Sequence, residues 1–134
     1  MVKNFLSLQI VKKNNTLFYI NSYTIGLLSE FLIIIFLIFK GYKIIRWRYK
    51  TKLGEIDIIA SKRKILYIIE VKYRKHNIRL DNLIRPNQIR RIKHAYLLFN
   101  NLKKYQNYEV NFDLITVEKR AKITHYKRYL QDVN

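Results

Sequence analysis

The sequence predicts an α/β domain in which a helix, three strands, a basic helix and a further strand form a small mixed sheet, in the order αβββαβ. Three observations favour this fold class. A long apolar stretch comes first, and short segments rich in β-branched and aromatic residues follow it. A later segment places apolar residues at helical spacing with basic residues between them. The 134 residues correspond to one domain by length and suffice to bury a core.

The first predicted helix spans Tyr23 to Phe39, the most apolar stretch of the chain. Polar residues that can cap a helix precede it, and Lys40-Gly41 is a typical helix C-terminal signal. A membrane span is the alternative, but the stretch is at the short limit for one. Glu30 near its middle would also cost roughly 2.5–3.5 kcal/mol in a bilayer. On a helix packed against a sheet, Glu30 would need a partner or a metal.

Residues 1–22 are interpreted as an N-terminal extension, and residues 23–134 as one domain. The extension has neither the basic start nor the small-residue cleavage site of a clear secretory signal. We therefore expect a cytoplasmic protein.

Three strands are expected next, at Tyr42–Tyr49, Gly54–Ala60 and Ile65–Tyr73. The third begins with an apolar run that does not alternate, which is typical of a central strand covered on both faces. Residues 61–64 are expected to form the turn between the second and third strands.

The second half of the chain is expected to be a polar loop, a helix and a strand. The loop covers Lys75–Arg85, and Pro86 then suits the first turn of a basic amphipathic helix over Asn87–Lys104. Tyr108–Val117 alternates enough to form a fourth strand. Residues 121–134 could form a further strand or a short helix, and the pattern does not decide between them.

The second and third strands carry the strongest chemical signal. Because side chains alternate along a strand, Glu70 and Lys72 project to one face while Val71 points into the core. If the strand that contains Asp57 pairs with this one, Asp57 is brought beside Glu70. Two carboxylates and a lysine would then lie at one place.

Two neighbouring carboxylates repel each other unless a cation lies between them, which indicates a divalent metal site with oxygen ligands. The chain has no cysteine, so Mg²⁺ or Mn²⁺ fits best, and no small-molecule cofactor is expected. We expect Asp57 and Glu70 to be metal ligands, with the Val71 backbone carbonyl and Glu30 as further candidates. In phosphodiester hydrolysis, Lys72 would stabilise the charge that develops on the phosphate.

Charge points to a polyanionic partner. Lysine and arginine number 27 against 9 acidic residues, a formal net charge of +18, so nucleic acid or an anionic membrane surface is expected. A bias toward A+T-rich codons would explain part of this excess. The basic side chains expected to bind nucleic acid, with DNA preferred, are Arg46, Arg48, Arg74, Lys75, Arg90, Arg91 and Lys93.

Each feature also has an ordinary explanation. A lone Glu-x-Lys triplet is common on exposed strands, Asp57 could end a strand, and Glu30 could pair with a buried arginine. The three histidines, at positions 76, 94 and 125, show no ligand spacing and are expected at the surface. The joint occurrence of Glu30, Asp57 and Glu70-x-Lys72 on a helix and two strands is more informative than any one of them.

A family resemblance runs from about residue 26 to residue 117. The residues that carry it are Gly26, Glu30, Gly41-Tyr42, Gly54-Glu55-Ile56-Asp57-Ile58-Ile59-Ala60, Ile69-Glu70-Val71-Lys72-Tyr73-Arg74, Ala95-Tyr96-Leu97 and Asn111-Phe112-Asp113-Leu114-Ile115. With them the chain resembles the YraN-like family of small bacterial proteins. That family is similar to the PD-(D/E)xK nucleases, which have the restriction-endonuclease-like fold also found in Holliday junction resolvases.

The resemblance implies that Glu30, Asp57 and Glu70 bind metal and that Lys72 is the catalytic lysine. The chain departs from the family's usual residues at Ser29, Ile33 and Tyr73, which makes the first helix more apolar and the residue beside the site bulkier.

Three functions follow from these observations. The first is a metal-dependent endonuclease that cleaves DNA, with branched or damaged structures as candidate substrates and a homodimer as a candidate assembly. The second is a nucleic-acid-binding protein without catalysis. The third is a membrane-associated basic protein that uses the helix at 23–39.

Overall fold

The computed structural model describes residues 10–13, 16–19 and 21–132. Strands β1 (Ile10–Lys13) and β2 (Thr16–Tyr19) pair antiparallel in a small separate sheet within the expected N-terminal extension. Residues 1–9, 14–15 and 20 of that extension lie outside the described residues.

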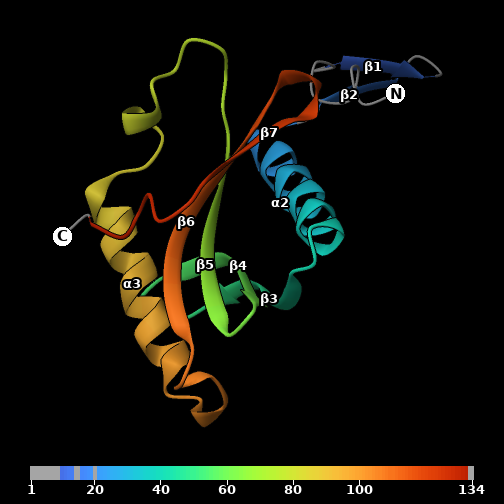
Figure 1. Ribbon diagram of the computed structural model, residues 1–134. Coiled ribbons are helices and arrows are strands. Elements are labelled where there is room, and N and C mark those ends of the chain that lie inside the picture. Colours follow the sequence, from blue (N-terminus) through green and yellow to red (C-terminus); the bar gives the residue numbers. More distant parts are fainter. Residues whose placement is uncertain (1–9, 14–15, 20, 133–134) are drawn as a thin grey trace.

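The main sheet has five strands in the order β3-β4-β5-β6-β7. They are β3 (Lys43–Lys50), β4 (Glu55–Lys62), β5 (Ile65–Tyr73), β6 (Glu109–Glu118) and β7 (Lys122–Tyr126). Neighbouring strands pair antiparallel except β5 and β6, which are parallel and joined by a crossover through helix α3. Figure 1 shows the two long helices on opposite faces of this sheet.

Helix α2 (Ser22–Phe39) covers one face. It begins where the Asn21 side chain accepts a hydrogen bond from the Thr24 N–H, and it ends before Gly41, whose φ of 82° suits glycine. Its inner residues Ile33 and Leu37 are buried against the sheet. By length and composition α2 could also cross a membrane. Its packing on the sheet instead agrees with the preferred prediction of a core helix.

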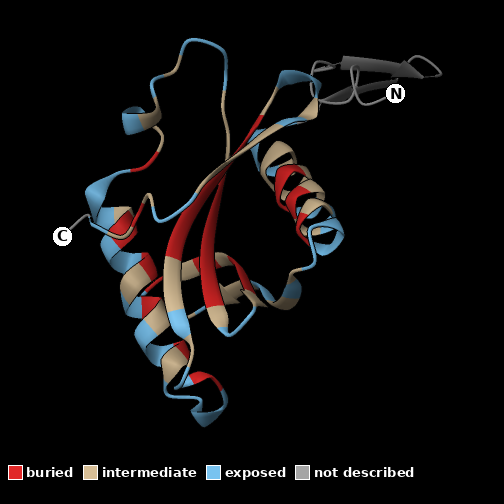
Figure 2. Cartoon of the chain, in the orientation of Figure 1, coloured by how far each residue is buried: buried red, intermediate tan, exposed pale blue. Residues whose placement is uncertain are grey.

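Helix α3 (Pro86–Asn100) covers the other face with a stripe of buried side chains at helical spacing, Ile89, Ile92, Ala95 and Phe99. Strand β5 lies between the two layers, and its consecutive residues Ile68 and Ile69 are both fully buried. Figure 2 shows the buried residues concentrated where the helices and sheet meet. The run without alternation in β5 therefore reflects a strand covered on both faces, as predicted.

The predicted order αβββαβ is confirmed, and it matches the core expected from the restriction-endonuclease-like resemblance. The undecided tail contains the fifth strand, β7. Short 3₁₀ turns occupy Leu80–Asn82 in the crossover, Lys103–Tyr105 after α3 and Lys119–Ala121 before β7.

Two boundaries differ from the prediction by more than one residue. Helix α3 ends at Asn100, and Lys103 and Lys104 belong to the 3₁₀ turn that follows. Strand β4 extends to Lys62, so the turn to β5 is only Arg63-Lys64. Both turn residues have positive φ, 51° and 59°, as the tightest hairpins require, and this conformation is not evident from two basic residues.

Gly54 allows β4 to approach α3 closely. A Cβ atom at this position would lie 2.4 Å from the backbone oxygen of Arg91, a distance that real contacts do not reach. We therefore expect Gly54→Ala to lower the free energy of unfolding by about 1–3 kcal/mol through overpacking, measured by urea denaturation. Gly26→Ala is the control, because a Cβ there meets nothing within 4 Å. That variant should be up to about 1 kcal/mol more stable, since Gly26 lies inside a helix.

Candidate metal centre

An open cavity of about 1160 Å³ lies where α2, the start of β4, the end of β5 and the start of α3 meet. It contains every residue for which the sequence predicts metal binding or catalysis. Its other lining residues come from these elements, from β3, from the loop after β5 and from the β6–β7 turn. The cavity is lined by Asn21, Ser22, Ile25, Gly26, Glu30, Arg48, Glu55, Asp57, Glu70, Val71, Lys72, Tyr73, Lys75, His76, Gln88 and Lys119.

Asp57 lies where β4 and β5 diverge. The pairing of these strands runs from Lys62↔Ile65 to Ile58↔Ile69 and stops there. Beyond that point the Val71 N–H donates to Oδ2 of Asp57 over 2.8 Å, so a side-chain carboxylate takes the place of the next backbone acceptor. This hydrogen bond gives the Val71 N–H an acceptor that the β4 backbone no longer supplies, and it fixes the Asp57 side chain in the cavity.

Glu70 and Lys72 project to the same side of β5, as strand alternation predicts. Lys72 Nζ lies 2.9 Å from Oε1 of Glu70. The Glu70 residue is only 4% exposed. Val71 between them packs on the opposite face with Ile33 and the rest of the α2-side core. From α3, the Gln88 side-chain amide donates a hydrogen bond to the same Glu70 oxygen.

The carboxyl groups of Asp57 and Glu70 lie close enough to interact directly, so the structure brings the two acids together. Burial, together with the neighbouring charge of Glu70, raises the pKa of Asp57 to about 8. Burial also raises the pKa of Glu70, and the adjacent Lys72 opposes that shift. The pair therefore retains a proton at neutral pH, at a position where a cation would satisfy both carboxylates.

Glu30 lies on the wall that α2 contributes, with its carboxylate held from β3. The Trp47 indole Nε1–H donates to Oε2 of Glu30 over 2.7 Å, and the Arg48 guanidinium Nε lies 3.8 Å from the same oxygen. Burial raises the pKa of Glu30, while the Trp47 hydrogen bond opposes the increase. The partner that the sequence predicted for this buried carboxylate is therefore an indole aided by an arginine.

Consecutive strand residues normally point to opposite faces, yet Trp47 and Arg48 both reach Glu30. Arg48 has a positive φ of 53°, which breaks the alternation and brings its side chain to the same face as Trp47. Arg48 also contacts Glu55 at 3.3 Å and donates to the Tyr23 hydroxyl at 3.0 Å. A strained backbone position thus supports one wall of the cavity.

The candidate metal ligands do not all converge in this conformation. Within the described residues, no three acidic or histidine side chains are grouped closely enough to hold a metal ion together. Asp57 and Glu70 form the adjacent pair, and Glu30 lies within electrostatic reach of both across the cavity. Two hard carboxylates suit Mg²⁺ or Mn²⁺, which commonly retain waters and bind substrate phosphates at their other positions.

The basic residues predicted to bind nucleic acid are distributed unevenly. Arg48 and Lys75 line the cavity, and Arg91 lines a smaller adjacent hollow with Arg85. Arg46 and Arg90 are exposed outside both hollows.

Two further predicted residues are held by bonds within the fold. Arg74 Nε donates to the Ile78 carbonyl, and its Nη1 lies 3.4 Å from Glu118. Lys93 Nζ donates to the Gln131 carbonyl at 2.9 Å. Sequence reasoning identified their charge but not the acceptors that engage them.

Several residues of the site carried no recognisable sequence signal. Gln88 and Trp47 contact the acids from α3 and β3, at separations that no local pattern reveals. Lys119 adds a cation from the β6–β7 turn. The expectation for His125 was wrong: its Nε2 lies 2.6 Å from Oδ2 of the fully buried Asp113, away from the cavity.

Comparison with known proteins gives a consistent assignment. Residues 29–117 match the model of the uncharacterised protein family UPF0102, also called the YraN family. A UPF0102 protein of Ehrlichia ruminantium is 39% identical over 109 residues, covering 81% of this chain and 85% of its own length. One from Ehrlichia chaffeensis is 44% identical over 90 residues, covering 67% and 73%. One from Alkaliphilus oremlandii is 37% identical over 109 residues, covering 75% and 92%.

The proton held by the acid pair makes stability depend on pH. The folded-state pKa of Asp57, about 8, exceeds the value near 3.9 of an unfolded aspartate. Its contribution to stability is therefore complete below about pH 4 and is lost as the pH rises through about 8. With chelator present, we expect the melting temperature of Asp57→Asn to fall by several degrees less than that of the wild type between pH 5 and 8.5.

Differential scanning calorimetry measures this difference. Glu109→Gln, which alters an exposed carboxylate at the start of β6, should keep the wild-type pH dependence. Equal pH dependence in Asp57→Asn and the wild type would contradict a shared proton.

Proposed function

This chain belongs to the UPF0102 family, and we propose that it is a divalent-metal-dependent nuclease that hydrolyses phosphodiester bonds in DNA. The main support for the proposal is that Asp57, Glu70 and Lys72 lie together in one open cavity of a strongly basic chain. All three residues, and Glu30 opposite them, lie within the span that matches the family.

The acid pair supports the proposed metal site. Asp57 and Glu70 would hold Mg²⁺ or Mn²⁺ in place of the proton they share, and the Val71 carbonyl is the proposed third oxygen. When bound, such an ion lowers the pKa of water and offsets charge on a phosphate oxygen. Glu30 faces the same space from α2 and can accept a hydrogen bond from water there.

The proposed role of Lys72 is electrostatic. Its ammonium is anchored by Glu70 at the edge of the cavity, and its side chain is 27% exposed. An ammonium fixed in this way stabilises the negative charge that develops on a phosphate in the transition state, and it can also orient the attacking water. Because Glu70 and Gln88 hold the site in place before substrate arrives, little reorganisation is required.

Basic groups on several sides of the acid pair support DNA as the substrate. Lys75 and Lys119 lie on the side of the β5 end and the β6–β7 turn. Arg85 and Arg91 line the neighbouring hollow, which shares Glu55 and Gln88 with the main cavity. A strand that crosses the acid pair would thus have cations near its flanking phosphates. We propose a cytoplasmic location and name branched and damaged DNA as the substrates to test first.

The main test compares cleavage and binding in the same variants. With Mg²⁺ or Mn²⁺, we expect Asp57→Ala and Lys72→Ala to lose at least about 100-fold in cleavage rate of branched DNA. Binding of the same DNA should persist and weaken steeply with salt. Lys104→Ala removes an equal charge on the 3₁₀ turn after α3, outside both hollows, and should cleave normally. Robust cleavage by both site variants would contradict the nuclease proposal. If the wild type binds DNA in a salt-dependent way but does not cleave it, the result would favour a non-catalytic DNA-binding protein.

Gln88 provides a test of the metal site that does not depend on turnover. Because its amide orients Glu70, we expect Gln88→Ala to weaken Mn²⁺ binding by about 10-fold or more, as loss of such supporting contacts usually does. Calorimetric titration without DNA measures the affinity. Asn87→Ala, an exposed neighbour on the same helix, should bind Mn²⁺ like the wild type. Unchanged affinity in Gln88→Ala would mean that Glu70 does not bind the metal.

A further inference from the structure

The side of α2 that faces away from the sheet is an exposed apolar surface. Phe31, Ile35, Ile38 and Phe39 lie on it at helical spacing and are 52%, 37%, 56% and 87% exposed. Trp47 on β3 adjoins them, with its ring centre 6.5 Å from that of Phe31 and 46% of the residue exposed. We call these five residues the outer patch. Figures 1 and 2 show α2 flanking the sheet on the side away from α3.

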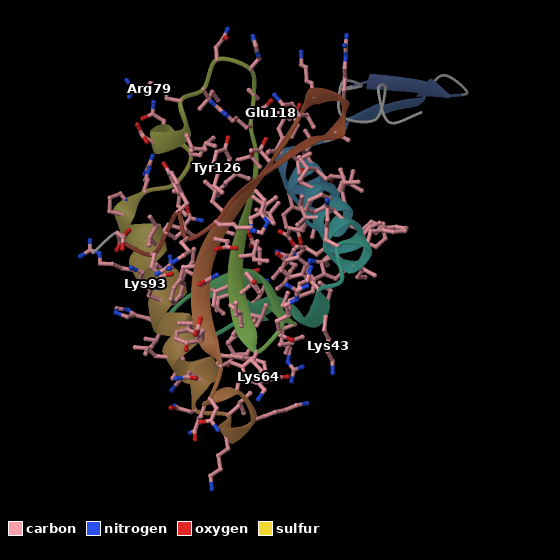
Figure 3. All side chains as sticks on the ribbon, in the orientation of Figure 1. Lys43, Lys64, Arg79, Lys93, Glu118 and Tyr126 are labelled. Carbon is pink, nitrogen blue, oxygen red and sulfur yellow. The ribbon has the colours of Figure 1, made fainter. Side chains whose placement is uncertain are left out.

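The outer patch is bordered by positive charge. The sequence contains no acidic residue from Phe31 to Gly54. Lys40, Lys43 and Arg46 are exposed at the end of α2 and on the first half of β3. Figure 3 shows the Lys43 side chain extending from the region below the C-terminal end of α2. Because the preceding acid in the sequence, Glu30, is buried and lines the cavity, this surface combines apolar and cationic groups.

We propose that the outer patch docks this protein onto the surface of an anionic lipid bilayer, with α2 lying in the plane of the interface. Acyl chains would cover the apolar side chains, and the lipid headgroups would neutralise Lys40, Lys43 and Arg46. A second copy of the chain would instead bring two molecules of net charge +18 together. Nucleic acid would match the cations but would leave Phe39 and Ile38 exposed to water.

The packing of α2 favours lying on the membrane over spanning it. Ser29, Ile33 and Leu37 on its inner side are fully buried against the sheet. A spanning helix would have to leave the sheet and expose the apolar residues that it covers, including Ile58 and Ile69. Surface docking keeps this core intact and also leaves Glu30 at the acidic cavity. The inference holds whether or not the cavity cleaves DNA.

Trp47 makes the test direct, because it is the chain's one tryptophan and part of the outer patch. Full-length protein is mixed with vesicles of phosphatidylcholine alone or with 30% phosphatidylglycerol. We expect the anionic vesicles to shift the tryptophan emission to shorter wavelength, shield it from acrylamide and carry the protein into the vesicle pellet. Lipid affinity should fall at least 10-fold in the double variant Ile38→Ser, Phe39→Ser, since two apolar anchors are lost.

Leu97→Ser is the matched control, because Leu97 is 58% exposed on α3 at the opposite face of the sheet. It should bind like the wild type, while Lys40→Gln with Lys43→Gln should weaken binding to anionic vesicles. Equal affinities of the outer-patch double variant and Leu97→Ser would overturn the proposal. Equal binding of the wild type to neutral and anionic vesicles would also overturn it. So would a lipid-free dimer in sedimentation that the double variant abolishes, because a second copy would then cover the patch.

Discussion

The hydrogen bond from the Val71 N–H to the Asp57 carboxylate is the contact on which the site depends. It forms where β4 and β5 separate, so the same backbone divergence that opens the cavity also fixes the first acid within it. The second acid, Glu70, precedes Val71 and must therefore lie beside Asp57. Burial of these two groups together raises their pKa values, so the pair retains a proton at neutral pH.

The periodicity of apolar and polar residues was sufficient to predict most of the fold and the residues at the centre of the site. The alternation Glu70-Val71-Lys72 gave the positions of all three side chains, because a strand offers only two faces. The length and composition of the stretch before β3 gave α2, although they could not separate a core helix from a membrane span. That distinction depended on tertiary packing, which buries Ile33 and Leu37. Strand β7 was undecidable because its five residues, Lys122–Tyr126, form too short a pattern.

The supporting contacts were beyond sequence reasoning for physical reasons. Trp47 and Arg48 reach Glu30 together only because Arg48 adopts a positive φ, which composition does not indicate for an arginine within a strand. Arg74 and Lys93 were predicted from charge alone, but Arg74 pairs with Glu118 and Lys93 donates to the Gln131 carbonyl, and both partners lie far along the chain. Long-range pairing of this kind depends on the complete fold, so charge alone could not separate structural cations from those open to a ligand.

The β4–β5 hairpin has a consequence for how this protein can change over evolution. Asp57, Glu70 and Lys72 all belong to that one hairpin, whereas most of the surrounding cations come from the crossover, the start of α3 and the β6–β7 turn. Loops of this kind tolerate substitution and insertion better than a buried strand pair does. The proposed chemistry can therefore be inherited as one compact unit while the choice of ligand diverges around it.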